Sequence, residues 1–376
     1  MQALIFSTIF STVFLLLNLY IYKRLILKLD VRKSTKHSLN IFLIVNFLGV
    51  IGYMLARYYV GIPNWLYFLL SLPIGILFLL FCTTLIYDIS RLILSKAPLS
   101  DSRRKFFKKS LDISSLLLAT SLSARAMYEA KFVKLEHVNI KIKNLLKPYK
   151  IVQLSDIHIG GLIDAEFMND IVQRVNILKP DLVVITGDLI DIDVDSAKDT
   201  LDILKSLKST YGTYYIVGNH EYFHGIEKII KAVKSLGIRV LENENVYIGS
   251  DGKGFNLAGV YDVFGYRTKS HMPDLKKALL NTKDSPIILL AHQPKYIEEV
   301  AEEHGVDLVL SGHTHGGQIY PFRFLVMLKQ PYISGLHHHN ENLQIYVNKG
   351  TGFWGPPMRL GASSEITEIN LEPKTL

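Results

Sequence analysis

The stretch that decides the fold lies at residues 150–158 and reads KIVQLSDIH. Its first part is a short run rich in β-branched residues, Lys150–Leu154, which predicts a buried strand. Two side chains that can bind metal, Asp156 and His158, follow where that strand ends. They lie two residues apart, so an extended backbone turns both toward one face. The stretch therefore predicts a strand that carries a ligand pair at its carboxyl end.

The same arrangement recurs four more times along the chain. Further strands are predicted at Asp181–Ile185, Thr213–Val217, Pro286–Leu290 and Val306–Leu310. Each is followed by residues that suit metal binding, namely Asp188, then Asn219, His220 and Glu221, then His292, and finally His313 and His315. Because sites in open α/β sheets form beyond the carboxyl ends of the strands, five such strand ends predict one shared site.

Helical patterns separate these strands, as is typical of a layered α/β fold. The predicted helices are Ala165–Leu178, Ala197–Lys208, Ile226–Leu236 and Lys295–His304. Two further regions, Ile238–Val260 and Gln344–Leu371, have the pattern of hairpins in an antiparallel or mixed sheet.

The ligand types limit the choice of metal. The only cysteine of the chain, Cys82, lies in an apolar run far from these motifs, which excludes a thiolate site in the C-terminal part. A set of nitrogen and oxygen ligands suits Mn, Fe, Zn or Co. The carboxylate of Asp188 could bridge two divalent ions about 3.5–4 Å apart, the separation found in two-metal hydrolytic sites.

Together these motifs resemble the signature of the calcineurin-like metallophosphoesterases, in particular the bacterial membrane-anchored members. The residues that carry the resemblance are Asp156-x-His158, Gly187-Asp188, Gly218-Asn219-His220-Glu221, His292 and Gly312-His313-Thr314-His315. The resemblance covers about residues 149–372 and implies a four-layer sandwich, in which helices flank two facing mixed β-sheets. It also implies an enzyme that hydrolyses phosphate esters with hydroxide activated by two divalent metal ions.

The resemblance implies a role for each site residue. One ion would be held by Asp156, His158, Asp188 and His315, and the other by Asp188, Asn219, His292 and His313. We expect His220 to protonate the leaving group or to steady the transition state. The alternative is that His220 only orients Asn219. Glu221 is expected to support His220 or a nearby backbone group.

The N-terminal third has the composition of a membrane region. Residues 1–22, 38–56 and 58–87 carry no charged side chain, and each run is long enough to cross a bilayer. Residues 1–128 hold 15 Lys/Arg against 4 Asp/Glu, whereas residues 129–376 hold 27 against 30. The positive charge therefore belongs to the membrane region, which argues against nucleic acid as a partner. We expect a membrane region at 1–128 and a catalytic domain at 129–376.

The distribution of Lys and Arg predicts the orientation of this region. The basic loops at residues 23–36 and 91–109 should face the cytoplasm of a bacterium, which places the N-terminus outside its plasma membrane. Residues 102–127 begin with SRRKFFK and continue into an apolar stretch, as in a twin-arginine export signal placed internally. If this segment crosses the membrane, as we expect, the catalytic domain is extracytoplasmic. The alternative is an amphipathic helix on the cytoplasmic face.

The motifs predict the type of reaction, and the position of the site beside a membrane indicates the class of substrate. A site beside a bilayer favours a phosphorylated small molecule or a lipid-linked phosphodiester or pyrophosphate. Phe353 and Trp354 could form an apolar wall of that site or a lip that faces the membrane, and the alternative is ordinary core packing. The competing interpretation is a membrane sensor or scaffold that binds metal without turnover. The complete ligand set argues against it. A run of three histidines at residues 337–339 is expected in an exposed loop rather than at a metal.

Overall fold

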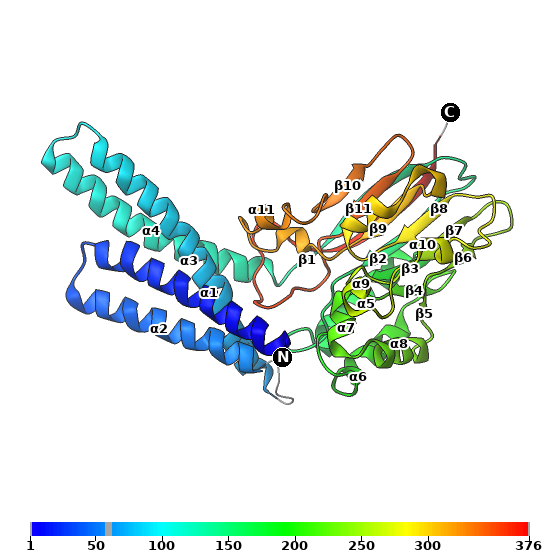
Figure 1. The fold of residues 1–376 in the computed structure, drawn as a ribbon, viewed down its shortest axis with the longest axis horizontal. Helices are drawn as coiled ribbons and strands as arrows, with labels where there is room; N and C mark the ends of the chain where they lie inside the picture. The colour runs from blue at the N-terminus through cyan, green and yellow to red at the C-terminus, as the bar shows by residue number, and fades with distance from the viewer. Residues whose placement is uncertain (1, 57–61, 375–376) are drawn as a thin grey trace. The chain divides into compact units, whose positions relative to one another are not determined.

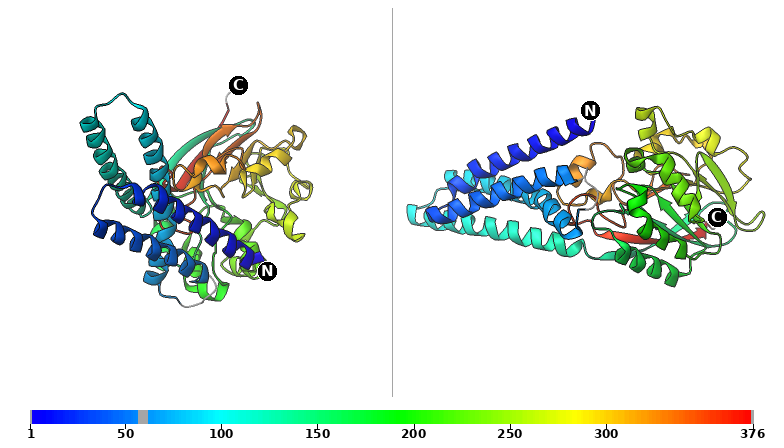
Figure 2. Two further views of the ribbon diagram at one scale, coloured as in Figure 1. Left: turned by 60° about the vertical axis from the view of Figure 1, so that its left-hand side comes forward. Right: turned by 90° about the horizontal axis from the view of Figure 1, so that it is seen from below.

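The computed structural model describes residues 2–56 and 62–374 and divides into two compact units (Figures 1 and 2). A helical unit comprises Met1–Lys131 together with the short segment Gly355–Leu360. An α/β unit comprises Phe132–Trp354 and Gly361–Leu376. Residue 1 of the first predicted apolar run and residues 58–61 of the third lie outside the described residues.

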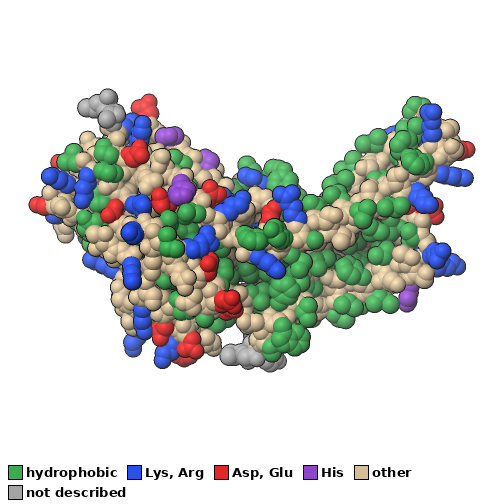
Figure 3. Space-filling model, turned by 180° about the vertical axis from the view of Figure 1, so that it is seen from behind, with side chains coloured by type: hydrophobic (Ala, Val, Ile, Leu, Met, Phe, Trp, Pro, Cys, Tyr) green, Lys and Arg blue, Asp and Glu red, His purple; other side chains and the backbone are tan. Residues whose placement is uncertain are grey.

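Within the described residues, three helices of the helical unit are long and apolar enough to cross a membrane. They are α1 (Gln2–Arg24), α2 (Lys33–Ala56) and α3 (Asn64–Lys96). A helix satisfies its backbone hydrogen bonds internally, which is the condition for a segment that lies in lipid. On the face shown in Figure 3, hydrophobic side chains cover these helices and Lys and Arg gather at their far ends. The chain is a membrane protein.

The predicted export segment forms one continuous helix, α4 (Asp101–Glu129), beyond a short turn after α3. The two helices lie side by side and run antiparallel (Figures 1 and 2). The guanidinium of Arg104 donates hydrogen bonds to the carbonyls of Leu94 (2.6 Å) and Ala97 (3.1 Å) at the end of α3. The second arginine of the twin pair therefore caps the C-terminus of α3, where carbonyl groups lack partners within the helix.

A buried carboxylate joins α4 to the rest of the helical unit. Asp112 accepts a hydrogen bond from the hydroxyl of Tyr87 in α3 (2.7 Å) and another from the backbone N–H of Asp30 (2.7 Å). Further along α4, Ala119 belongs to the same apolar core as Leu77 of α3. The packing of α4 along α3 thus continues well beyond the turn.

The α/β unit consists of two six-stranded mixed sheets. The first has the order β1 (Val133–Ile142), β12 (Ser364–Pro373), β2 (Tyr149–Leu154), β3 (Leu182–Thr186), β4 (Thr213–Ile216) and β5 (Arg239–Val240). The second has the order β10 (Gly335–His338), β11 (Gln344–Val347), β9 (Leu308–Ser311), β8 (Ile287–Leu290), β7 (Phe255–Gly259) and β6 (Glu244–Ile248). Strands β2 to β5 are parallel, as are β7, β8, β9 and β11.

Three apolar cores hold these layers together. The central core is made by side chains of both sheets, such as Val184 of the first and Leu290 of the second. The outer face of the first sheet packs against α5 (Ala165–Leu178), α6 (Val194–Asp202) and α8 (Ile226–Ser235). The outer face of the second packs against α10 (Leu275–Ala278) and the 3-10 helix η3 (Pro294–Glu299). This is the predicted four-layer arrangement, so the fold class is confirmed.

Three local predictions were wrong. The region Gln344–Leu371 is no hairpin, because β11 pairs with β9 in the second sheet whereas β12 pairs with β1 and β2 in the first. Ile238–Val260 contains the β6–β7 hairpin, but β5 joins the first sheet. Lys295–His304 forms two 3-10 turns, since the chain becomes extended at Val300, whose side chain enters the core. Alternating patterns reveal strands but not their partners.

Candidate metal centre

The structure brings the seven predicted metal ligands together at the carboxyl ends of five strands. From the first sheet, β2 leads into Asp156 and His158, β3 into Asp188, and β4 into Asn219 at the start of α7 (Asn219–His224). From the second sheet, β8 leads into His292, and β9 into His313 and His315. Parallel strands within each sheet place these ends at one edge, where the two sheets deliver their ligands from opposite sides.

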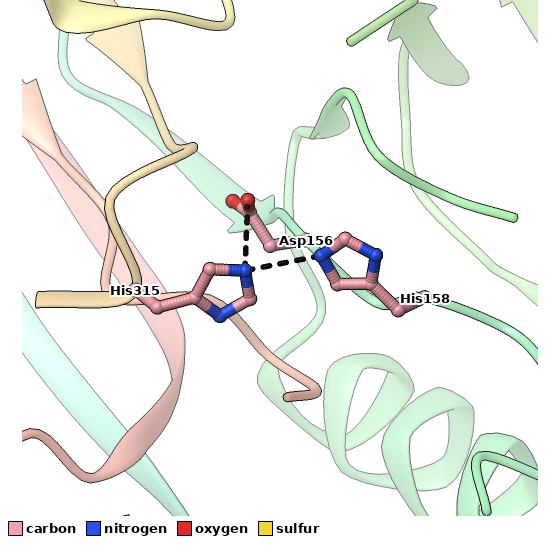
Figure 4. Close-up of side chains that lie close together, drawn as sticks. All are labelled: Asp156, His158 and His315. Atoms are coloured by element: carbon pink, nitrogen blue, oxygen red, sulfur yellow. Dashed lines mark hydrogen bonds and ion pairs between the residues drawn. The ribbon is translucent and has the colours of Figure 1, made fainter. Parts of the chain in front are cut away.

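Asp156, His158 and His315 form a first cluster (Figure 4). The Nε2 atoms of His158 and His315 lie 3.0 Å apart, and Nε2 of His315 lies 3.4 Å from a carboxylate oxygen of Asp156. All three side chains are buried. Two imidazole nitrogens and a carboxylate that converge on one point are an arrangement that a divalent cation would satisfy.

Asp188, His292 and His313 form a second cluster. Nε2 of His292 lies 3.2 Å from Oδ2 of Asp188, while its Nδ1 is 2.7 Å from the carbonyl oxygen of Thr186 and donates to it. Burial lowers the pKa of His292, but Asp188 and Asp156 outweigh this effect and raise it well above its ordinary value, so a metal ion would bind Nε2 in place of a proton. Burial and the positive charge of the neighbouring His292 lower the pKa of His313 to about 3, so the imidazole of His313 is neutral.

Asp188 lies between the two clusters. Its Oδ2 atom is 3.2 Å from Nε2 of His292 in the second cluster and 4.0 Å from Nε2 of His158 in the first. A carboxylate in that position could serve as a ligand to both cations. The geometry therefore suits Asp188 as a ligand shared by two ions.

The surroundings of Asn219 also fit a bound cation. Its side-chain oxygen is buried and has no hydrogen-bond partner, which is costly unless another group binds it. At Gly218, a Cβ atom would collide with the carboxylate of Asp188 and come within 2.8 Å of Nε2 of His292. A glycine is needed there because the backbone approaches the cluster so closely. The residues present thus fit two divalent metal ions.

Five of the predicted ligands have a left-handed backbone conformation. The φ angles are 49° at Asp156, 57° at His158, 51° at Asp188, 70° at His313 and 49° at His315. Residues other than glycine rarely adopt positive φ, and each instance costs of order 1–3 kcal/mol. Strain of this kind concentrates at functional sites, where the surrounding fold holds it in place.

Sequence reasoning missed one residue of the site, Asp191. The chain turns after β3, and an isolated bridge between Ile159 and Ile190 places Asp191 beside the first cluster. One oxygen of Asp191 lies 2.9 Å from Nδ1 of His158 and 2.6 Å from Nδ1 of His220. The available signal was a second aspartate three residues after Asp188, in the pattern Gly-Asp-x-x-Asp.

Asp191 also affects the pKa of His220. Burial raises the pKa of its carboxyl, but His158 and His220 outweigh this effect and hold the pKa well below its usual range. Burial lowers the pKa of His220, yet Asp191 and Asp188 raise it overall to about 9. His220 therefore retains a proton at neutral pH and could donate it.

Asp191→Asn should lower turnover of a phosphodiester about 10–100-fold, because outer partners of ligating and catalytic histidines have effects of this size. Removal of the carboxylate lowers the pKa of His220, so the loss of activity at high pH should begin at a lower pH than in the parent. The pH dependence of kcat measures this shift. A uniform loss at every pH would instead indicate a purely structural role.

Glu221 supports the backbone of the site, as expected. Its buried carboxylate accepts hydrogen bonds from the N–H groups of Leu189 (2.8 Å), Gly218 (2.6 Å) and Asp188 (3.1 Å). It thereby joins the ends of β3 and β4 and fixes the loops that carry Asp188 and Asn219.

Glu221→Gln should lower the free energy of unfolding by about 3 kcal/mol, because the amide turns its own N–H groups toward these donors and leaves buried groups unsatisfied. The denaturant midpoint of the full-length protein in detergent measures the effect. Glu227→Gln, at an exposed position of α8, is the control and should leave the midpoint unchanged. Equal midpoints for both variants would contradict the assigned role.

The histidines at 337–339 lie apart from these clusters. His337 lies 2.9 Å from the carbonyl oxygen of Ser334 and stacks on the ring of Tyr332, and Nδ1 of His339 is 3.2 Å from the Tyr332 hydroxyl. The metal-binding groups found among residues 2–56 and 62–374 do not include them.

A two-sheet sandwich with buried Asp and His clusters at its strand ends defines a class of metal-dependent hydrolases, and comparisons with known proteins agree. Residues 149–317 match the calcineurin-like phosphoesterase family. The chain is 39% identical over 373 residues to an uncharacterized metallophosphoesterase of Helicobacter pylori, with 99% of each chain covered. It is 38% identical over 379 residues to one of Campylobacter jejuni, also with 99% of each covered.

The similarity extends beyond bacteria. The chain is 31% identical over 397 residues to a transmembrane protein with metallophosphoesterase domain of Danio rerio, covering 99% of this chain and 91% of the relative. The chain belongs to the calcineurin-like phosphoesterase family. It is a metallophosphoesterase, as its motifs predict, and hence a hydrolase.

Proposed function

We propose that this protein hydrolyses phosphodiesters or pyrophosphates, including lipid-linked ones, at the surface of the membrane that holds its helices. The observation that carries the proposal is the pair of buried clusters that meet at Asp188. Asp156, His158, Asp188 and His315 would hold one ion, and Asp188, Asn219, His292 and His313 the other. Mn, Fe, Zn and Co all suit these ligands.

The residues of the site divide the chemistry among them. Two bound ions would lower the pKa of water and neutralise charge that develops on the phosphoryl oxygens. His220 holds its proton on Nε2, 3.9 Å from Oδ2 of Asp188, while Nδ1 is fixed by Asp191. From that position it would donate the proton to the leaving oxygen. The ring of Trp354 contacts His220 edge-on, with centroids 5.9 Å apart.

The chain itself supports a substrate at the membrane. Trp354 is followed directly by Gly355–Leu360, which belongs to the helical unit. In that segment the N–H of Arg359 donates to the carbonyl of Ala126 in α4 (2.8 Å), and the Arg359 side chain is fully buried. A residue in contact with His220 is therefore tied covalently to the membrane-embedded part. An amphiphilic phosphoester would reach such a site without leaving the bilayer surface.

We further propose that the α/β unit lies on the extracytoplasmic side of a bacterial plasma membrane. The antiparallel packing of α4 on α3 supports this, because α4 then returns toward the side on which α3 begins. Its 29 residues span about 43 Å, enough to cross a bilayer. Protease added to intact spheroplasts should digest the α/β unit, and protection of that unit would place it in the cytoplasm.

Hydrolysis is tested with the full-length protein in detergent. After metal removal by a chelator, the protein is supplied with Mn, Fe, Co or Zn and assayed with bis-p-nitrophenyl phosphate and with a pyrophosphate diester. We expect turnover that depends on the added metal. A folded protein that binds metal but turns over neither substrate would support the sensor or scaffold instead.

A further inference from the structure

The α/β unit exposes a group of large apolar side chains directly after the metal-binding motif at the end of β9. This segment, residues 320–328, includes helix α11 (Arg323–Val326) and is named here the apolar loop (Figure 1). The exposed side chains are Tyr320 (46%), Phe322 (46%), Phe324 (52%), Leu325 (56%), Met327 (55%) and Leu328 (76%). Contiguous exposed apolar side chains of this kind mark interaction sites on proteins.

The backbone of the apolar loop is suited to an apolar environment. Its N–H groups are largely bound within the loop, since Leu325 donates to Phe322 (2.9 Å), Met327 to Arg323 (3.0 Å) and Leu328 to Leu325 (3.2 Å). Backbone groups satisfied in this way lose little when they leave water. The side chains can therefore enter lipid without exposing unsatisfied polar groups.

The charges of the apolar loop favour a negatively charged surface. Arg323 lies within it and Lys329 follows it, and the sequence has no acidic residue between Asp307 and Glu341. Aromatic and aliphatic side chains beside basic ones are typical of segments that lie at a membrane interface and contact anionic headgroups. Helix α4 packs along α3, and β1 begins four residues after the end of α4, so a short connection joins the α/β unit to the helices that can cross a membrane.

The loop is also joined to the site. The side-chain amide of Gln318 donates to the carbonyl of Trp354 (2.8 Å), and its oxygen accepts from the Trp354 N–H (3.1 Å). Gln318 stands between His315 and the start of the apolar loop, while Trp354 contacts His220. The position of the loop is thus fixed relative to the metal centre.

We propose that the apolar loop rests in the headgroup region of the bilayer that holds α1–α3, with Arg323 and Lys329 directed at anionic lipid phosphates. The loop then acts as a further attachment of the α/β unit to the membrane, besides the covalent connections to the helical unit. It holds the metal centre close to the lipid surface.

The test uses the full-length protein in nanodiscs made of equal parts of phosphatidylcholine and phosphatidylglycerol. In a Cys82→Ala background, Leu328→Cys is labelled with an environment-sensitive fluorophore, and doxyl-labelled phosphatidylcholine is the quencher. Leu280→Cys is the matched control, because Leu280 is an exposed leucine of the same unit (63%) outside the loop. We expect strong quenching at position 328 and none at position 280.

Two results would overturn the proposal. One is an unquenched label at position 328. The other is emission at 328 that changes only when a disc holds two copies of the protein, which would make the loop a contact between copies. Arg323→Gln and Lys329→Gln should each lower the ratio of docked to undocked loop roughly fivefold in these anionic discs. The readout needs no turnover, so it is independent of the proposed hydrolysis.

Discussion

Asp188→Asn is expected to abolish hydrolysis of bis-p-nitrophenyl phosphate and to lower the metal content of the protein. The carboxylate of Asp188 lies between both clusters, 3.2 Å from Nε2 of His292 and 4.0 Å from Nε2 of His158. A neutral amide cannot balance the charge of two cations. A loss of several kcal/mol of transition-state stabilisation corresponds to a fall in turnover of roughly a thousandfold or more. Turnover and bound metal are measured on the same samples.

The fold should survive this change. Oδ1 of Asp188 accepts a hydrogen bond from the N–H of His220 (2.9 Å), and the side-chain oxygen of asparagine can accept the same bond. Asp307→Asn is the matched control, since Asp307 accepts a backbone N–H at the start of β8, away from the site. It should retain activity and metal. Full activity in Asp188→Asn would refute the shared-ligand assignment.

His220→Ala should leave the metal content near that of the parent while turnover falls about 10²–10⁴-fold, the usual contribution of a positioned acid. The ring of His220 is bound through Nδ1 to Asp191 and packs against Trp354 and Phe223. Its task is therefore to present a proton rather than to hold an ion. Metal analysis beside the rate assay separates these two roles.

The alternative role for His220 is that of a metal ligand. His158, Asp191 and His220 also lie close enough together to form a metal-binding group of their own. Loss of one bound ion in His220→Ala would move His220 into the ligand set and leave the proton donor unassigned. His337→Ala removes a histidine that contacts Ser334 and Tyr332, and it controls for nonspecific effects of histidine loss.

Sequence patterns were most informative where one strand and its ligands are neighbours in the chain. The run before Asp156 is a strand because its Val, Ile and Leu side chains are buried between layers, and the ligands follow because the strand ends there. Such information is local, so the strands β2, β3, β4, β8 and β9 were predicted within a few residues. Their shared edge followed from the rule for parallel sheets.

Features that depend on distant partners could not be predicted in this way. Asp191 looks like any loop aspartate until the turn after β3 brings it beside His158 and His220. The strands β11 and β12 have similar patterns, yet they belong to different sheets. Likewise, the amino-acid sequence of Gly355–Leu360 does not indicate that this short segment returns to the helical unit. Only the folded chain reveals these pairings.

The left-handed backbone at five ligands has a consequence for the life of the protein in the cell. At about 1 kcal/mol or more for each residue, the total strain approaches the whole stability of an ordinary domain. Metal ions that bind only the folded chain would raise its free energy of unfolding and so offset this strain. We therefore expect the supply of metal to influence the abundance of the protein as well as its activity, because chains without metal would unfold more often and be removed by proteases.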